Sequence, residues 1–578
     1  MPKNVMKMMK PRPNPGRNDF DLSHRTLFTA NYGELIPGAC IETVPDDKII
    51  IRISDLVRAQ PMVTSPYVRA KQHCDVWFVP YQLMWSKFNE FVVDKDEPGS
   101  SAFKDRAFAP YTDLDSLEKV MQGYHARTWS DLHGAACVDQ VARNLDLLGY
   151  AGTLLHASTQ GDAQYVNRSV NLWRLFAYNL IWYREYRQQY YDDGKYLLPS
   201  SFASLANAAA YLFNADWKVC SNLTTAKFNG SDPDELGLLS AMCQPRYRCW
   251  KKDLFTGLMP STQFGAVSVV DTSLPTGVNI RNYSANAFSQ NVETDPNRLL
   301  RTANNLSTWN LEAIGVTTPS NFDILALRKS EAIQKWRERS LRAGNQVQDN
   351  FEAHYGVKPK SHMDIHPQHI ASFDAPLNIG DIMSNADTGV GVNGVVGDVA
   401  GKGIMSFDGR QAIKFEASDF GVIMVIYSVL PEAEYNANGI DRLNCLLERE
   451  DYFFNEYENL GLEAVDKTVI SHLGNTQGVI GYAPRYFGYK QKLDRVCGSF
   501  QMFQGYSGQF APWCAPKYDV DAALSSYAVM PLSCLYVNPA IYNNNFHYEY
   551  DVVDQFLVDF YCDVEAIRAM SVSGMPGY

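Results

Sequence analysis

The stretch that decides the fold lies near the end of the chain, where residues 555–564 read QFLVDFYCDV. Apolar residues at positions 556, 558, 560, 562 and 564 alternate there with mostly polar ones, and this period of two is typical of a strand with one buried face. A strand of this strength needs a pairing partner, and the segment 26–58 near the N-terminus is the natural candidate. The sequence therefore predicts a sheet that joins the two ends of the chain.

Other segments near the two ends also have strand character. Ile49, Ile51 and Ile53 alternate with Ile50, Arg52 and Ser54, and Cys74, Val76 and Phe78 alternate with His73, Asp75, Trp77 and Val79. Apolar side chains on both faces predict sheets that are covered on both sides. The continuous apolar run 421–430 predicts a fully buried strand.

The middle of the chain is mixed and partly helical. Residues 171–190 (NLWRLFAYNLIWYREYRQQY) carry apolar side chains around most of a helical circumference, which predicts a helix packed on several sides. Residues 321–343 predict a second helix, with one apolar stripe formed by Phe322, Leu325, Ala326, Ala332, Ile333 and Trp336. Strands, then a helical and loop-rich insertion, then strands are the order expected of a mainly β jelly-roll sandwich with grafted loops.

Four segments follow from this pattern. We expect an extended basic N-terminal arm at 1–25, N-terminal jelly-roll strands at 26–130, helical and loop insertions at 131–345, and C-terminal jelly-roll strands and loops at 346–578. The stretch 266–320 is the clearest long irregular segment, rich in Asn, Ser and Thr.

Composition limits the function. The 578 residues carry a formal net charge of -12, so this chain cannot coat nucleic acid with its whole surface, and any such contact is confined to a local patch. Eleven cysteines without a CxxC pair predict reduced thiols and folding in a reducing cytoplasm. We expect no secretion signal, and the longest apolar run is too short to span a membrane.

The N-terminal arm is the feature with a direct nucleic-acid rationale. It carries Lys3, Lys7, Lys10, Arg12 and Arg17 without an acidic residue up to position 18, and four prolines disfavour regular structure. Five cations on single-stranded DNA would give a salt slope of about -3.5. The arm is therefore expected to tether DNA without neutralising it, and a terminus with no function is the open alternative.

The sequence contains only incomplete versions of catalytic motifs, and we expect no catalytic residue and no cofactor. Gly401-Lys402 is followed by Gly403 where a phosphate-binding loop needs Ser or Thr, so 389–403 is interpreted as a plain loop. His362, Asp364, His366 and His369 are weak metal candidates. Pro367 interrupts any helix through them, and solvated loop histidines are the favoured interpretation.

Five segments, in this order, resemble the major capsid protein of the microviruses, especially the gokushovirus-like lineages. They are 20–92 (FDLSHRTLFTANYGELIPG through SKFNEFV), 176–188 (FAYNLIWYREYRQ), 252–265 (KDLFTGLMPSTQFG), 334–357 (QKWRERSLRAGNQVQDNFEAHYGV) and 482–490 (YAPRYFGYK). The five segments are spread in the right order over most of the chain, whereas 200–245 and 266–320 match poorly.

The resemblance implies an eight-stranded viral jelly roll and a single-layer icosahedral (T=1) shell of sixty copies, built through pentamers around circular single-stranded DNA. It implies DNA on the inner face, an external protrusion at the threefold axes within 266–320, and a host receptor bound by outer loops. A small basic DNA-binding protein and a pilot or scaffolding protein are further implied partners. The protein would reside in the virion after assembly in the bacterial cytoplasm.

Two other functions remain as alternatives at this point. A secreted or surface carbohydrate-binding β-sandwich protein would also be acidic and rich in Tyr and Trp, but it would usually carry a secretion signal. A helical binding protein is suggested by 171–190 and 321–343, although the strand-rich ends argue against it.

Overall fold

The structure is a computed structural model. It describes residues 16–85, 88–93, 108–123, 138–192, 196–197, 209–210, 227–228, 233–263, 280–283, 310–313, 324–343, 352–356, 366–383, 399–409, 411–472, 478–501, 510–517, 530, 534–550, 552–570 and 572. The chain divides into two compact units, of which the first comprises Met1–Pro260 with Pro359–Tyr578 and the second comprises Ser261–Lys358.

The first unit contains an antiparallel sheet that joins the two ends of the chain, hereafter the terminal sheet. Its order is β1 (Asn18–Asp21) and β2 (His24–Ala30), then β23 (Phe556–Arg568), β4 (Lys48–Ala59), β16 (Val399–Asp408) with β17 (Ile413–Glu416), and β15 (Asn378–Met383). Val558 lies opposite both Phe28 and Val57. The prediction that the last strand pairs with the segment 26–58 is therefore confirmed.

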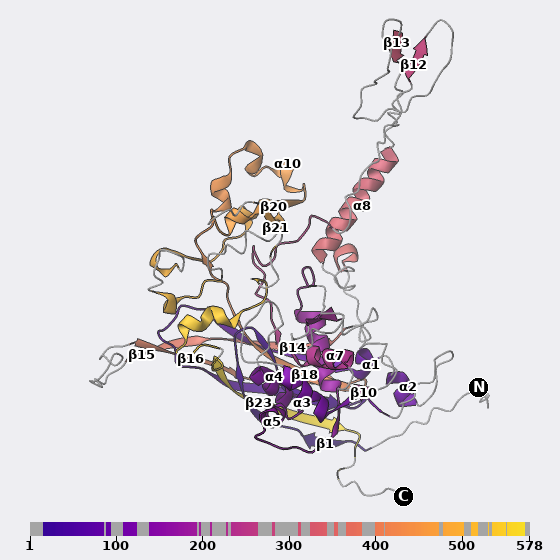
Figure 1. The fold of residues 1–578 in the computed structure, drawn as a ribbon, viewed down its shortest axis with the longest axis vertical. Coiled ribbons are helices and arrows are strands. Elements are labelled where there is room, and N and C mark those ends of the chain that lie inside the picture. The colour runs from indigo at the N-terminus through magenta and orange to yellow at the C-terminus, as the bar shows by residue number, and fades with distance from the viewer. Residues whose placement is uncertain are drawn as a thin grey trace, which may run out of the picture. The chain divides into compact units, whose positions relative to one another are not determined.

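A second antiparallel sheet, hereafter the central sheet, lies against the first. Its order is β11 (Arg246–Tyr247), β3 (Glu34–Thr43), β18 (Gly421–Pro431), β5 (Ala70–Pro80) and β14 (Gln368–Pro376). Strand β18 is buried along nearly its whole length, as the apolar run 421–430 predicts. In Figure 1, indigo strands from the start of the chain lie together with orange strands from its later part.

The main core lies between the two sheets. The terminal sheet contributes Ile49, Ile51, Ile53, Val558 and Phe560, and the central sheet contributes Cys74, Val76, Phe78, Ile423 and Val425. These are the alternate positions of each strand, so one side of every pleat is removed from water. This sheet-rich architecture with antiparallel sheets is compatible with a β-sandwich.

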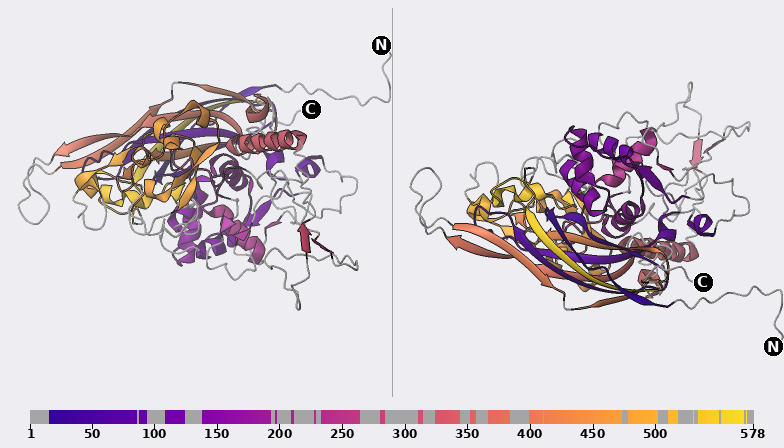
Figure 2. Two further views of the ribbon diagram at one scale, coloured as in Figure 1. Left: turned by 90° about the horizontal axis from the view of Figure 1, so that it is seen from above. Right: turned by 90° about the horizontal axis from the view of Figure 1, so that it is seen from below.

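Helices cover the other side of the central sheet. They are α1 (Tyr81–Met84), α2 (Phe88–Val93), α3 (Leu114–Gly123), α4 (Val138–Leu147), α5 (Gly152–Thr159), α6 (Trp173–Ile181), its π-helical continuation (Trp182–Tyr186) and α7 (Pro233–Cys243). Figure 2 shows the purple helices gathered on one side of the strands. Trp77, Val79, Val422 and Met424 pack into this helical core.

Helix α6 confirms the prediction of a helix surrounded on several sides. Every residue from Trp173 to Ile181 except Arg174 is buried. Within this layer, β10 (Lys227–Phe228), β6 (Tyr111–Asp113) and β7 (Ser169–Asn171) form a small sheet, and β8 (Tyr196–Leu197) pairs with β9 (Ala209–Ala210).

Short elements between β18 and β23 surround a third, smaller core that contains Phe255, Val465, Ile480 and Phe487. They include β19 (Tyr435–Asn436), β20 (Leu462–Asp466), β21 (Val479–Pro484), β22 (Arg495–Val496), α10 (Asn455–Glu458) and α11 (Phe487–Lys490). Single 3-10 turns lie at Arg442–Cys445, Arg449–Asp451, Lys467–Val469, Gly498–Phe500, Ala511–Trp513 and Pro539–Asn545. None of the described helices is both long and apolar enough to cross a membrane.

The second unit contains the hairpin of β12 (Ile280–Tyr283) with β13 (Asn310–Ala313), and helix α8 (Ile324–Ala343). The predicted second helix is thus confirmed from residue 324 onward. Its expected stripe is not wholly buried, because Ala332 and Trp336 are exposed.

Two sequence interpretations are wrong. Residues 399–403, expected in a loop, begin strand β16, because Ile404 and the residues after it continue a ladder with β4. The expectation that sheets are covered on both sides holds for the central sheet alone. On the outer face of the terminal sheet, Leu27, Leu56 and Leu557 remain exposed among the described residues.

Candidate nucleic-acid interface

The uncovered side of the terminal sheet, hereafter the open face, arises from the same alternation that builds the core. In β4, Ile49, Ile51 and Ile53 point inward, so Arg52, Leu56 and Arg58 point outward. The same parity directs Arg25 and Leu27 of β2, and Leu557, Asp559, Tyr561, Asp563 and Glu565 of β23, to the open face. Strand β16 adds Lys402 and β17 adds Lys414.

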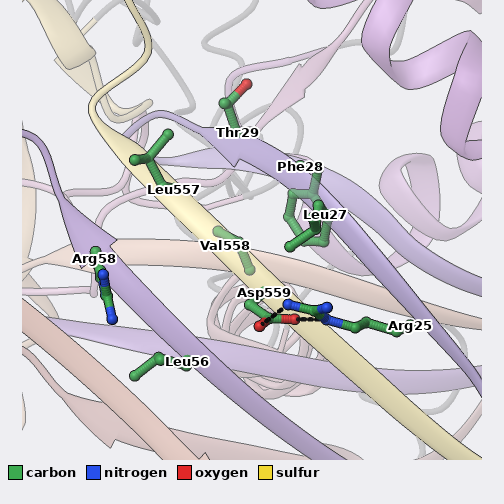
Figure 3. Close-up of a pocket in the computed structure, with 9 residues that line it drawn as sticks. All are labelled: Arg25, Leu27, Phe28, Thr29, Leu56, Arg58, Leu557, Val558 and Asp559. Carbon is green, nitrogen blue, oxygen red and sulfur yellow. Dashed lines mark hydrogen bonds and ion pairs between the residues drawn. The ribbon is translucent and has the colours of Figure 1, made fainter.

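A shallow depression of about 500 Å³ lies on this face, and Figure 3 shows the side chains around it. Its floor and walls are mainly apolar, with Leu27 67% exposed and Leu557 51% exposed. The lining residues are Arg25, Leu27, Phe28, Thr29, Leu56, Arg58, Leu557, Val558 and Asp559. An apolar hollow with guanidinium groups at its edge can hold an apolar or planar group that carries a nearby negative charge.

Three acidic groups of β23 on the open face are paired with two arginines. Arg25 donates from Nε and Nη2 to the two carboxylate oxygens of Asp559, both at 2.6 Å, and these hydrogen bonds lower the pKa of Asp559. Arg52 donates to Asp563 at 2.8 Å and to Glu565 at 3.2 Å. Such charge-assisted pairs fix the carboxylates along β23 and offset two of their three negative charges.

Three cations on the open face remain available. Arg58, Lys402 and Lys414 form no ion pair with any residue that the structure describes, and each is exposed. In a chain of net charge -12, any nucleic-acid contact must use locally exposed cations of this kind. Arg58 and Lys402 lie toward one end of β4, and Lys414 lies opposite Ile50 toward the other. Guanidinium and ammonium groups bind phosphate oxygens through charge-assisted hydrogen bonds.

The basic arm enters the structure at the rim of the same sheet. Strand β1 pairs with the end of β23, with Phe20 opposite Ala566. Arg17 forms an ion pair with Asp46, so its charge is partly satisfied within the chain. Lys3, Lys7, Lys10 and Arg12 lie outside the described residues, and their role stays a prediction.

The histidine cluster is divided by the structure. His362 and Asp364 lie outside the described residues. His366 is buried, and His369 lies on strand β14, where its Nε2 is 2.6 Å from the Ser372 hydroxyl and its ring packs edge-on to Trp77. The interpretation as solvated loop histidines is wrong for His366, which is buried. His369 is exposed, as expected, but it lies on a strand and not in a loop. Within the described residues, no group of three or more His, Cys, Asp or Glu side chains could hold a metal ion.

Sequence reasoning did not find the open face. The available signal was the spacing of two in β2 and β4, which puts Arg25 beside Leu27 and Arg52 in line with Leu56 and Arg58. A sheet face on which cations alternate with apolar residues differs from a buried face, which is apolar, and from an ordinary solvent-exposed face, which is polar.

Comparison with known proteins gives two findings. The family model of the capsid protein (F protein) matches residues 12–118 and 149–578. Capsid protein VP1 of Chlamydia phage 1 is 22% identical over 636 residues, an alignment that covers 97% of this chain and 95% of the relative.

Proposed function

The chain belongs to the capsid protein (F protein) family and is a structural capsid protein of a Microviridae phage, and we propose that it assembles into a T=1 shell around circular single-stranded DNA. In this proposal sixty copies form the shell, the number that icosahedral symmetry requires of one chain in equivalent positions, and pentamers are the assembly intermediate. The protein is a virion component. Family membership replaces the alternative of a secreted or surface carbohydrate-binding protein.

The observation that carries the proposal is the pairing order of eight strands. In chain order these are β2, β3, β4, β5, β14, β16, β18 and β23. The first pairs with the last, the second with the seventh, the third with the sixth and the fourth with the fifth. Such nesting is the signature of a long hairpin rolled into two sheets, and it supports an eight-stranded viral jelly roll.

In this proposal the open face looks inward, toward the DNA. Support comes from Arg58, Lys402 and Lys414, which form no ion pair among the described residues, and from the attachment of the basic arm through β1 to the same sheet. Lys3, Lys7, Lys10, Arg12 and Arg17 of the arm tether the DNA. Because each copy supplies few cations, a small basic DNA-binding protein brings most of the remaining neutralising charge.

The remaining segments have roles that the resemblance to microvirus capsid proteins implies. Segments 26–130 and 346–578 supply the strands, and 131–345 supplies the insertions. The stretch 266–320 makes a protrusion at the threefold axes, and outer loops bind the host receptor. A pilot or scaffolding protein assists assembly in the bacterial cytoplasm.

An electron cryomicroscopy map of shells purified from infected or expressing bacteria tests this arrangement. We expect sixty copies, the open face turned inward, and density for 266–320 outside the shell at the threefold axes. An open face that points outward, or a protrusion built from another segment, would overturn the assignment.

A further inference from the structure

A second surface of the first unit exposes large aromatic side chains without an evident reason in the isolated chain. Tyr452, Phe453, Phe454 and Tyr489 are exposed, and Leu447 beside them is 87% exposed. Contiguous apolar exposure of this kind marks an interaction site. We call the exposed side chains of 447–460, together with Tyr489, the aromatic surface.

The rings of this surface are held in fixed positions by one another. Phe453 packs edge-on to Tyr486 at 5.3 Å between ring centroids, and Tyr486 packs against Tyr489 at 6.4 Å. The guanidinium of Arg485 lies 5.3 Å from the Tyr486 ring and 5.9 Å from the Tyr457 ring. Exposed rings that are already ordered lose little entropy when a partner covers them.

The backbone under these rings is also constrained. Tyr486 has a φ of +60°, a left-handed conformation that a tyrosine rarely adopts. Its N–H donates to Glu463 at 2.9 Å, and Glu463 accepts from Arg442 at 2.8 Å. Strain of this kind persists where the surroundings enforce it, which is typical of functional surfaces.

The aromatic surface is strongly acidic. Residues 447–460 contain five acidic residues (Glu448, Glu450, Asp451, Glu456 and Glu458) and one basic residue (Arg449), a net charge of -4. Asp451 and Glu458 have cationic partners in Arg442 and Lys490. Glu450 and Glu456 are exposed and form no ion pair among the residues described, so a partner for this surface should be basic and partly apolar.

Helix α8 in the second unit has that chemistry. Its twenty residues contain six basic residues (Arg328, Lys329, Lys335, Arg337, Arg339 and Arg342) and two acidic ones (Glu331 and Glu338), a net charge of +4. At 100° per residue, Arg328, Ala332, Lys335, Trp336 and Arg339 share one face. All five are exposed, and Trp336 is 57% exposed although it stacks on His354.

We propose that in the assembled shell the aromatic surface of one copy binds the Trp336 face of α8 from a second copy. The exposed acids Glu450 and Glu456 of the aromatic surface and the basic helix α8 are complementary in sign, and each side offers an apolar centre bordered by charge, as stable protein interfaces do. Trp and Arg are the residues most enriched among those that dominate binding. This inference rests on the proposed shell.

Nucleic acid is the competing occupant for α8 alone. A basic helix can bind phosphate, but the exposed Trp336 and Ala332 between its cations favour a protein surface. The aromatic surface itself would repel phosphate. Protein is therefore the occupant that accounts for both surfaces at once.

A charge exchange in the full-length chain tests the contact. The acidic variant, named for the surface that it alters, carries Glu450→Lys and Glu456→Lys. The basic variant alters helix α8 and carries Arg328→Glu and Arg339→Glu, and the combined variant carries all four substitutions. We expect each pair alone to raise the protein concentration needed for shells by roughly tenfold or more, because every contact in the shell is weakened. The combined variant should regain most of the assembly.

A matched control carries Asp162→Lys and Asp381→Lys, which make the same change of net charge at exposed acids on other elements. It should assemble like the unmodified protein. Equal loss in the control and the acidic variant, or no recovery in the combined variant, would overturn the specific contact.

Zero-length coupling of carboxylates to amines identifies the two copies. Shells assembled from an equal mixture of ordinary and nitrogen-15-labelled protein are treated with a carbodiimide, and amide-linked peptides are analysed by mass spectrometry. We expect Glu450 or Glu456 joined to Lys329 or Lys335, with light and heavy peptides combined. Links found only within one isotope, or Lys329 and Lys335 protected by DNA instead, would overturn the inference. Failure of the unmodified protein to form shells would instead refute the proposed function.

Discussion

Replacement of Arg143 by methionine tests the buried ion pairs that link the helical layer to the two sheets. Arg143 on α4 forms ion pairs with Glu34, at the start of β3, and with Asp554, just before β23, the latter at 3.1 Å. Glu34 is fully buried, and Asn31 is the described residue that still donates to both carboxylates once the guanidinium is removed. Loss of one partner of a buried ion pair costs about 3–5 kcal/mol, so we expect that decrease in the free energy of unfolding at pH 7.5.

The loss of stability in Arg143→Met should depend on pH in a direction that the pKa of Glu34 determines. Burial raises the pKa of Glu34, and Arg143 opposes that rise, so the pKa should rise further in Arg143→Met. A carboxyl with a raised pKa in the folded state binds a proton that the unfolded chain releases. The stabilising contribution of this carboxyl is present at pH values below its pKa in the unfolded chain, and it is lost as the pH rises through its pKa in the folded chain. The decrease in the free energy of unfolding caused by Arg143→Met should therefore be smaller at pH 5 than at pH 7.5.

The assay is urea unfolding of the full-length chain, followed by circular dichroism at both pH values. Addition of Glu34→Gln to Arg143→Met removes the uncompensated charge and should recover about half of the loss. An Arg143→Met protein that unfolds at the wild-type urea concentration at both pH values would refute this account of the network.

Three further predictions concern the core, the acid response and DNA. Phe560 is fully buried beside Phe28, so Phe560→Ala should cost about 3–5 kcal/mol in urea unfolding and Phe560→Leu about 1 kcal/mol; equal effects would contradict a tightly packed core. Burial and, second to it, the positive charge of Arg248 lower the pKa of His73 to about 4. As the pH falls, the unfolded chain therefore takes up a proton on this residue before the folded chain does, and stability is lost between pH 6.5 and pH 4. Because the ring is only partly buried, we expect His73→Gln to remove about 2 kcal/mol of this acid loss, with Asp75, Asp374 and Lys71 unchanged, and an identical acid profile would argue against the assignment. Replacement of Arg58, Lys402 and Lys414 by alanine should reduce the salt slope of single-stranded DNA binding by about 2, whereas Lys48→Ala, whose ammonium is paired with Glu416, should leave it nearly unchanged; an unaltered slope in the triple variant would exclude the open face as a DNA contact.

The parts of the fold that the sequence predicts are those where one physical signal dominates. The alternation at 555–564 and the apolar run 421–430 identify β23 and β18, because a strand with one or two buried faces leaves a direct pattern in sequence. Helices α6 and α8 are likewise evident from their period. The nested pairing of the strands is a long-range property, and local patterns can only suggest it.

The errors come from tertiary context. Gly401, Lys402 and Gly403 have the composition of a loop, but pairing between β15 and β16 holds them in a strand. His369 is expected in a loop, but pairing of β14 with β5 places it on a strand, and His366 just before that strand is buried. Trp336 belongs to an apolar stripe that the chain alone does not bury, and the open face looks in sequence like any half-polar strand. The last two features concern surfaces that another molecule would cover, and a single chain cannot reveal its partner through periodicity.

Sedimentation of the purified full-length protein, with negative-stain imaging of the fast fraction, tests the central claim most directly. Sixty copies of a 65.1 kDa chain give a particle of about 3.9 MDa, and a pentamer gives about 0.33 MDa. The account predicts closed shells of the larger mass, with pentamers as the intermediate. A protein that stays monomeric even when the other phage proteins are supplied would contradict it.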